Sequence, residues 1–153
     1  MAIELYVWFS KKVFSDIKTW PKFKATVFES GIRTILGSAG LSGNVLMQEG
    51  NPICKSFVVA LPSTNVTPMV FRTYEALYDN YDCTVVQAAC ATTATPDLFK
   101  PMSINSNGMI ESFVGAGLND SNPINIMLEE AVMLFGLSQS VACMVSIGAG
   151  NSA

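Results

Sequence analysis

The sequence predicts an α/β domain with a largely parallel sheet, and three observations support this prediction. The chain has 153 residues, which is enough for one domain spanning 1–153 rather than two. Its apolar β-type runs are short and nearly continuous, as in strands that are covered on both faces. Segments with helical periodicity separate most of these runs, in the order αα, β, β, α, β, α, β, which is typical of parallel connections.

Four segments predict helices. Residues 3–14 and 25–36 are amphipathic, with apolar side chains at three- and four-residue spacing. Residues 84–94 are rich in small side chains, which would let this helix approach a sheet closely. The fourth helix is expected from Pro123, a residue type favoured in the first helical turn, to about Phe135.

Four β-type runs predict the strands. Residues 56–61 and 141–147 are nearly continuous apolar runs, which favours strands buried on both faces. Residues 69–74 and 112–114 are expected to form the other two strands. Between the second helix and the first strand, residues 37–52 are rich in Gly, Ser and Asn and predict a flexible loop.

The composition favours a domain with a large buried core, or part of a larger unit whose cut faces would be covered. Half of the residues are hydrophobic, 14% are charged and the mean hydropathy is +0.36. No apolar run reaches the roughly 18 residues needed to span a bilayer. Because the N-terminal segment also lacks a basic stretch followed by an apolar one, we expect a cytoplasmic protein.

The charge pattern argues against nucleic acid as a partner. The net charge is −3, and no basic stripe crosses the chain. A solvated helix face and loop is the simplest explanation for the basic cluster near the N-terminus, and peripheral contact with an anionic membrane surface is the alternative. The cluster consists of Lys11, Lys12, Lys18, Lys22 and Lys24.

The absence of histidine excludes several kinds of site. A Ser-His-Asp or Cys-His nucleophile system cannot be built from this chain alone. The cysteines, at 54, 83, 90 and 143, form no C-x-x-C pair, so we expect no metal site and no cofactor. Cys54, Cys90 and Cys143 lie in apolar segments and are expected to be buried free thiols.

The strongest candidate site is the turn between the strand at 112–114 and the helix that begins at Pro123. The strand ends at Gly115-Ala116-Gly117, and a polar turn containing Asp120 follows. A strand, a glycine turn and a helix form the usual layout of a site at the carboxyl end of a strand. Asp120 is expected to cap the helix, with a catalytic role as the alternative.

Other motifs are missing or weak. No serine lies in a G-x-S-x-G nucleophile elbow, and no G-x-x-x-x-G-K-[ST] phosphate loop occurs. Glu129 with Glu130, and Asp79 with Asp82, are the remaining carboxylate pairs. We expect these side chains to be solvated, since adjacent residues of a helix do not face each other.

With these segments placed, the chain resembles the patatin-like phospholipases, in the variety common in filamentous fungi. The resemblance covers nearly all 153 residues in the same order. It rests on a lysine-rich helix and loop, a strand pair, a small-residue helix with its exit, and an acid loop with its following strand. These stretches are 11–26, 54–60 with 68–74, 91–101, and 113–124 with 145–150.

The resemblance implies a three-layer α/β/α fold and lipid acyl ester hydrolysis. The family uses a serine in a G-x-S-x-G elbow, an aspartate in a D-G-[GA] loop and an upstream glycine-rich oxyanion loop. In this chain the elbow and the oxyanion loop would precede Met1, so the domain is expected to be an N-terminally truncated, C-terminal portion. The aspartate position falls on Gly115, followed by Ala116 and Gly117 as the two small residues after the acid.

These expectations define two hypotheses about function. The first is a lipid-metabolism domain of the phospholipase family, with lipid or an acyl ester as its partner, that is inactive as this chain. The alternative is a pseudoenzyme or truncated product acting as a binding or interaction module. Because the missing strands would leave an open sheet edge, self-association is expected in either case.

Overall fold

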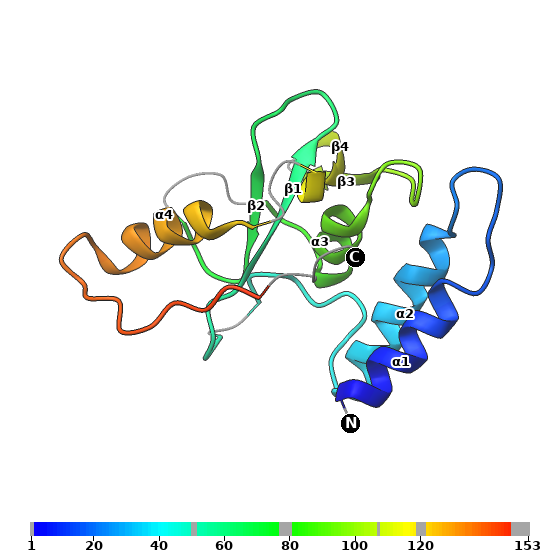
Figure 1. Ribbon diagram of the computed structural model, residues 1–153, viewed down its shortest axis with the longest axis horizontal. Coiled ribbons are helices and arrows are strands. Elements are labelled where there is room, and N and C mark those ends of the chain that lie inside the picture. Colours follow the sequence, from blue (N-terminus) through cyan, green and yellow to red (C-terminus); the bar gives the residue numbers. More distant parts are fainter. Residues whose placement is uncertain (1, 50–51, 77–80, 107, 119–121, 148–153) are drawn as a thin grey trace, which may run out of the picture. The chain divides into compact units, whose positions relative to one another are not determined.

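The computed structural model describes residues 2–49, 52–76, 81–106, 108–118 and 122–147. The chain divides into two compact units, Met1–Ala116 and Gly117–Ala153, and each is described by itself. The first unit contains three α-helices and a sheet, and the second contains one α-helix followed by extended chain (Figure 1).

The sheet of the first unit is antiparallel, so the prediction of a largely parallel three-layer sheet is wrong. The strands follow the order β2-β1-β4-β3, and each neighbouring pair is antiparallel. The physical reason is the length of the connections: residues 63–68 join β1 to β2 and residues 107–108 join β3 to β4. A parallel pair needs a crossover of a dozen or more residues. The strands are β1 (Phe57–Pro62), β2 (Met69–Arg72), β3 (Met102–Ser106) and β4 (Met109–Gly115).

Helix α3 (Val85–Thr93) packs against the sheet, as its small side chains predicted. Thr84 precedes it with a capping box: the Thr84 hydroxyl accepts a hydrogen bond from the Gln87 backbone N–H, and the Gln87 side chain accepts one from the Thr84 N–H. These two bonds satisfy donors that the first turn of a helix leaves unpaired, and they fix where α3 begins.

Two hydrophobic clusters lie on either side of α3. The cluster between α3 and the sheet includes Ala88 and Ala91 of the helix with Phe71 and Phe113 of the strands. In the second cluster, α3 packs against the first two helices and the segment that follows α3. Its members are Val13, Phe23, Phe28, Val86, Cys90 and Phe99. Because α3 is covered on both sides, it is the central element of the first unit.

Helices α1 (Ala2–Val13) and α2 (Ala25–Ser38) form where the amphipathic patterns predicted helices, and they lie side by side (Figure 1). The rings of Phe9 and Phe28 meet edge to face with their centroids 5.1 Å apart. Gly31 makes this contact possible, because a Cβ atom at that position would lie 2.6 Å from the Phe9 ring. The two helices therefore pack through an aromatic side chain that fits over a glycine.

The loop between α2 and β1 is more ordered than its composition predicted. Met47 is buried in the cluster between α3 and the sheet. The Met47 N–H donates to the Cys83 carbonyl at 2.9 Å, and the Val85 N–H donates to the Val45 carbonyl at 3.0 Å. Part of the 37–52 loop is thus tied to the start of α3.

The second unit contains α4 (Ile124–Phe135), which matches the predicted helix. The strand predicted at 141–147 is wrong, because these residues form extended chain outside any sheet. Val145 is 71% exposed and Ile147 is 91% exposed. A β-type sequence forms a strand only where a neighbouring strand accepts and donates its backbone hydrogen bonds.

In the part of the chain that the structure describes, no helix has both the length and the apolar character required to cross a membrane.

Candidate functional site

The candidate site lies at the end of β4, where the sequence predicted a glycine turn after a strand. Gly115 is the last residue of β4 and pairs with Ala60 of the central strand β1. Its backbone N–H donates to the carbonyl oxygen of Ala94, just beyond the end of α3, at 3.0 Å. The position that the resemblance assigns to the catalytic acid is therefore a junction between β1, β4 and the end of α3.

This junction leaves no room for a side chain at position 115. A Cβ atom there would lie 2.7 Å from the carbonyl oxygen of Thr92 and 3.4 Å from the backbone nitrogen of Thr95. Both neighbours are backbone atoms, so they cannot turn away as a flexible side chain could. The Thr92 hydroxyl also donates to the Val59 carbonyl at 2.6 Å, which fixes the end of α3 against β1.

The small residues after Gly115 have different environments. Ala116 is buried and Gly117 is exposed, and both belong to the short 3-10 helix η1 (Ala116–Leu118). Asp120, the possible substitute acid, lies outside the described residues. At the start of the second unit, the Asn122 side-chain oxygen accepts a hydrogen bond from the Ser146 hydroxyl at 3.2 Å.

The hydroxyl groups near the junction already donate to backbone carbonyls. The Thr92 hydroxyl donates to Val59, and the Thr93 hydroxyl donates to Ala89 at 2.7 Å. A nucleophilic hydroxyl needs a base that accepts its proton. A carbonyl oxygen cannot serve as that base, so neither threonine is arranged as an activated nucleophile.

One polar pair that joins β4 to another segment was missed by the sequence analysis. The Tyr81 hydroxyl donates to the Glu111 carboxylate of β4, and the Tyr81 ring packs edge to face against Phe71 and Phe113. The alternation of β4 could have indicated it, because Glu111 and Phe113 lie two residues apart and share a face of the strand. The pair joins the segment before α3 to the sheet, which is a structural role.

The other predicted carboxylate pairs do not form a site in the described residues. Glu129 is exposed as predicted, but the prediction that Glu130 is solvated is wrong, because Glu130 is buried and does not share a surface with its neighbour. Asp82 is exposed, and Asp79 lies outside the described residues. Within the described ranges, no group of three or more acidic or cysteine side chains is arranged to hold a metal ion.

The cysteines fall into two classes, and the prediction that Cys54 and Cys143 are buried is wrong. Both are exposed, whereas Cys83 and Cys90 are buried. Burial raises the pKa of the Cys83 thiol from 9.0 to about 12, and the nearby Asp82 carboxylate adds to the shift. Burial raises the pKa of the Cys90 thiol to about 11, with Glu29 adding to the shift and Arg33 opposing it. The two buried thiols are therefore poor nucleophiles at neutral pH.

No family model, no curated protein and no solved structure matches this chain. What the site can do chemically must therefore be argued from its own geometry. At the end of β4 that geometry is a closed packing junction, with neither a carboxylate nor space for one at position 115.

Proposed function

We propose that this chain is a domain associated with lipid metabolism, related to the patatin-like phospholipases, that does not itself hydrolyse acyl esters. The observation at Gly115 supports the statement that the chain does not hydrolyse acyl esters. It stands where the resemblance expects the catalytic aspartate, and a Cβ atom there would lie 2.7 Å from the Thr92 carbonyl oxygen. The position lacks an acid and is packed in a way that excludes one.

The proposed relation to the patatin-like phospholipases rests on the order of the motifs. The resemblance expects a strand pair, a small-residue helix, and a strand followed by a glycine turn. Elements β1 and β2, then α3, then β4 with Gly115-Ala116-Gly117, follow in that order. The antiparallel pairing and the lack of a strand at 141–147 differ from what the resemblance implied, so the support comes from the order of the other motifs and not from the sheet.

An esterase assay tests the proposal. The purified chain is incubated with p-nitrophenyl esters of short and long acyl chains, and release of p-nitrophenol is compared with a buffer blank. We expect no hydrolysis, because the chain has no G-x-S-x-G serine and no acid at position 115. Hydrolysis that survives rigorous purification and is lost in Asp120→Asn would overturn the proposal and assign the base to Asp120.

Substitution at position 115 tests the packing argument itself. Gly115→Asp is expected to lower the free energy of unfolding by about 1–3 kcal/mol, because its Cβ would force β4 away from the end of α3. Gly117→Asp is the matched control: a Cβ there meets nothing within 4 Å, and the change should stay within about 0.5 kcal/mol. Equal stability of the two variants in denaturant titrations would show that the acid position can still accept a side chain.

A second candidate function, an interaction module, is favoured by the apolar surface of the second unit. Leu137 is 89% exposed, and Val145 and Ile147 are similarly uncovered. A hollow of about 510 Å³ lies between α4 and the chain that follows it, and its lining includes Met127, Phe135 and Met144. Exposed apolar surface of this kind marks contact with another molecule, and we propose a second copy of this chain as the partner.

Light scattering after size-exclusion chromatography tests self-association. We expect the apparent mass to rise with protein concentration, and Val145→Asp to reduce that rise. Val66→Asp, on an 82% exposed residue of the first unit, is the control. A monomer at all concentrations, with one sharp cooperative unfolding transition, would exclude the self-association.

A further inference from the structure

The first 24 residues differ in charge from the rest of the chain. They contain five of its nine basic residues, against the two acids Glu4 and Asp16. The remaining residues carry four basic and ten acidic side chains, so the N-terminal region is basic on a protein whose net charge is −3. Such a local charge attracts an anionic partner to this region specifically.

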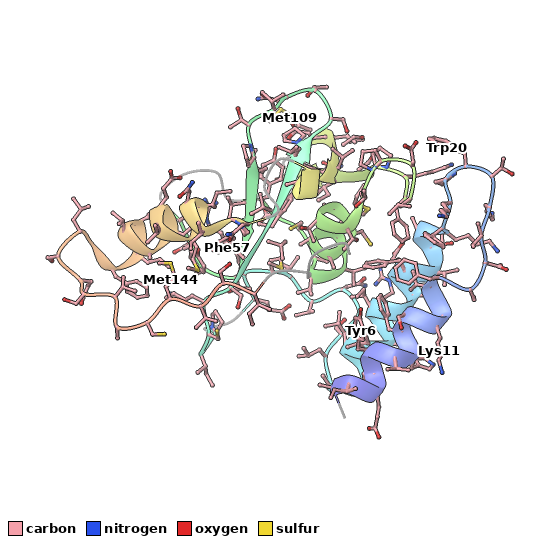
Figure 2. The ribbon with its side chains drawn as sticks, in the orientation of Figure 1. Tyr6, Lys11, Trp20, Phe57, Met109 and Met144 are labelled. Atoms are coloured by element: carbon pink, nitrogen blue, oxygen red, sulfur yellow. The ribbon has the colours of Figure 1, made fainter. Side chains whose placement is uncertain are left out.

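Large apolar side chains are exposed in the same region. Ile17 is 70% exposed, Trp20 is 65% exposed and Phe14 is 48% exposed. Figure 2 shows Trp20 on the loop that joins α1 to α2, and Lys11 on α1. The loop therefore carries both apolar groups and ammonium groups, and we name residues 14–22 with Lys24 the Trp20 surface.

The backbone under the Trp20 surface is held in place by the rest of the first unit. The Lys18 N–H donates to the Lys22 carbonyl at 2.9 Å. The Lys22 N–H donates to the backbone carbonyl of Asp97 at 3.0 Å, and the Phe23 N–H donates to the backbone carbonyl of Leu98 at 2.9 Å. The Phe14 and Phe23 rings meet edge to face, 4.8 Å apart. Ile17 and Trp20 are thus presented to solvent by an anchored loop.

The loop also borders a basic hollow. Its volume is about 320 Å³, and Lys18, Trp20, Lys24 and Lys100 are among its lining residues. Lys24 pairs with Asp16 at 3.1 Å on the exposed side of the loop. An aromatic ring beside several ammonium groups suits a partner that has an apolar layer next to an anionic layer. The ring would contact the apolar layer, and the ammonium groups would contact the anionic one.

We propose that the Trp20 surface docks on anionic lipid bilayers. Tryptophan is enriched at the boundary between headgroups and acyl chains, and lysine stems cover apolar surface while their ammonium groups reach the phosphates. Each lysine near an anionic bilayer strengthens binding about fivefold, while Ile17 and Trp20 supply the apolar part of the contact. Single-stranded nucleic acid fits less well, because the exposed apolar groups include the aliphatic Ile17 and the overall charge is negative. This proposal uses no residue of the β4 junction and does not rest on the proposed function.

Tryptophan fluorescence tests the contact directly. The chain has two tryptophans, so Trp8→Phe leaves Trp20 as the only reporter. Vesicles of phosphatidylcholine alone are compared with vesicles containing 30% phosphatidylserine. We expect the Trp20 emission to shift to shorter wavelength, and brominated lipid to quench it, with the anionic vesicles only. Raising the salt concentration should reverse both changes, because it screens the lysines.

Vesicle sedimentation with the full chain assigns the side chains. Lys18→Gln with Lys22→Gln is expected to weaken binding about 25-fold, and Lys55→Gln outside the surface should change it less than twofold. Ile17→Ala should weaken binding, and Val66→Ala, at an even more exposed residue, should not. Circular dichroism of each variant checks that these exposed substitutions leave the fold intact.

Three results would overturn the proposal. One is that the protein binds neither the neutral nor the anionic vesicles. Another is equal binding to neutral and anionic vesicles. The last is that a single-stranded oligonucleotide binds as tightly as the anionic vesicles, displaces them, and leaves the Trp20 emission unshifted. That result would indicate a general polyanion site.

Discussion

Strand β1 and residues 141–147 have similar apolar sequences and opposite surroundings. In β1, Val59 is 8% exposed and Ala60 is fully buried, because β2 and β4 pair with the strand on either side and α3 packs against it. In the later segment, Val145 is 71% exposed and Ile147 is 91% exposed. An apolar β-type run thus becomes a strand through its partners, and its own composition does not decide the outcome.

The helices show the same contrast. In α3 the buried residues are Val86, Ala88, Cys90 and Ala91, which point into two clusters. In α4 the buried residue is the acid Glu130, although α4 is the more apolar of the two helices. The first unit has a packed core on both sides of its central helix, and the second unit leaves most of its apolar side chains exposed. Three predictions test this difference.

Thiol reactivity should show the largest difference between the packed core of the first unit and the exposed chain of the second unit. At pH 8, Cys143 of the second unit is expected to react rapidly with a disulfide reagent. Cys83 should react about a thousandfold more slowly, because burial raises its pKa to about 12 and lowers its thiolate fraction accordingly. Cys90 should be slow and Cys54 fast. The measurement is the absorbance time course of the native protein, with all four thiols reacting in denaturant as the control.

The raised pKa of Cys83 also predicts how the free energy of unfolding changes with pH. The unfolded chain loses the Cys83 proton near pH 9, whereas the folded chain keeps it until about pH 12. Below pH 8 the Cys83 thiol is protonated in both the folded and the unfolded state, so its ionisation does not change the free energy of unfolding. Above pH 9 the unfolded state binds fewer protons, so the free energy of unfolding should fall as the pH rises. A Cys83→Ala variant with an unchanged slope above pH 9 would contradict this assignment.

Local patterns in the sequence predicted the helices correctly and the sheet direction incorrectly. Periodicity over a dozen residues is a property of the helix itself, and the cap of α3 lies in the adjacent residues Thr84 and Gln87. Sheet direction depends on which strands meet. The Asn107-Gly108 pair is a typical hairpin signal in the sequence, and Gly108 has the positive φ of +82° that such turns require.

The candidate site shows a second limit of sequence reasoning. The sequence explains Gly115 as a turn residue, and its position at the end of a strand is correct. The reason that glycine is required is the carbonyl oxygen of Thr92, more than twenty positions earlier in the chain. A contact between residues so far apart follows from how closely α3 approaches the sheet, and no local pattern at position 115 contains that information.

Truncation of a phenylalanine should have the next largest effect. Phe113 is fully buried in β4, with Phe71 and Tyr81 packed edge to face against its ring at 5.1 and 5.6 Å. Phe113→Ala is expected to lower the free energy of unfolding by about 3–5 kcal/mol through lost burial and the cavity left behind. Phe135→Ala in the second unit, where the ring is 58% exposed, should cost less than about 1 kcal/mol. Denaturant titrations measure both, and similar losses would remove the contrast between the units.

Removing the cap at the start of α3 should have the smallest effect on the free energy of unfolding. This change tests one hydrogen bond that α3 has and α4 lacks. Thr84 caps α3 with its hydroxyl, whereas α4 begins after Pro123 without a side-chain cap. Thr84→Ala is expected to lower the free energy of unfolding by about 1 kcal/mol, because the Gln87 N–H loses its acceptor. Thr84→Ser keeps the oxygen and should lose much less. If the alanine and serine variants have the same denaturant midpoint, the hydroxyl does not stabilise α3, and the stability of this helix comes from its two packed faces alone.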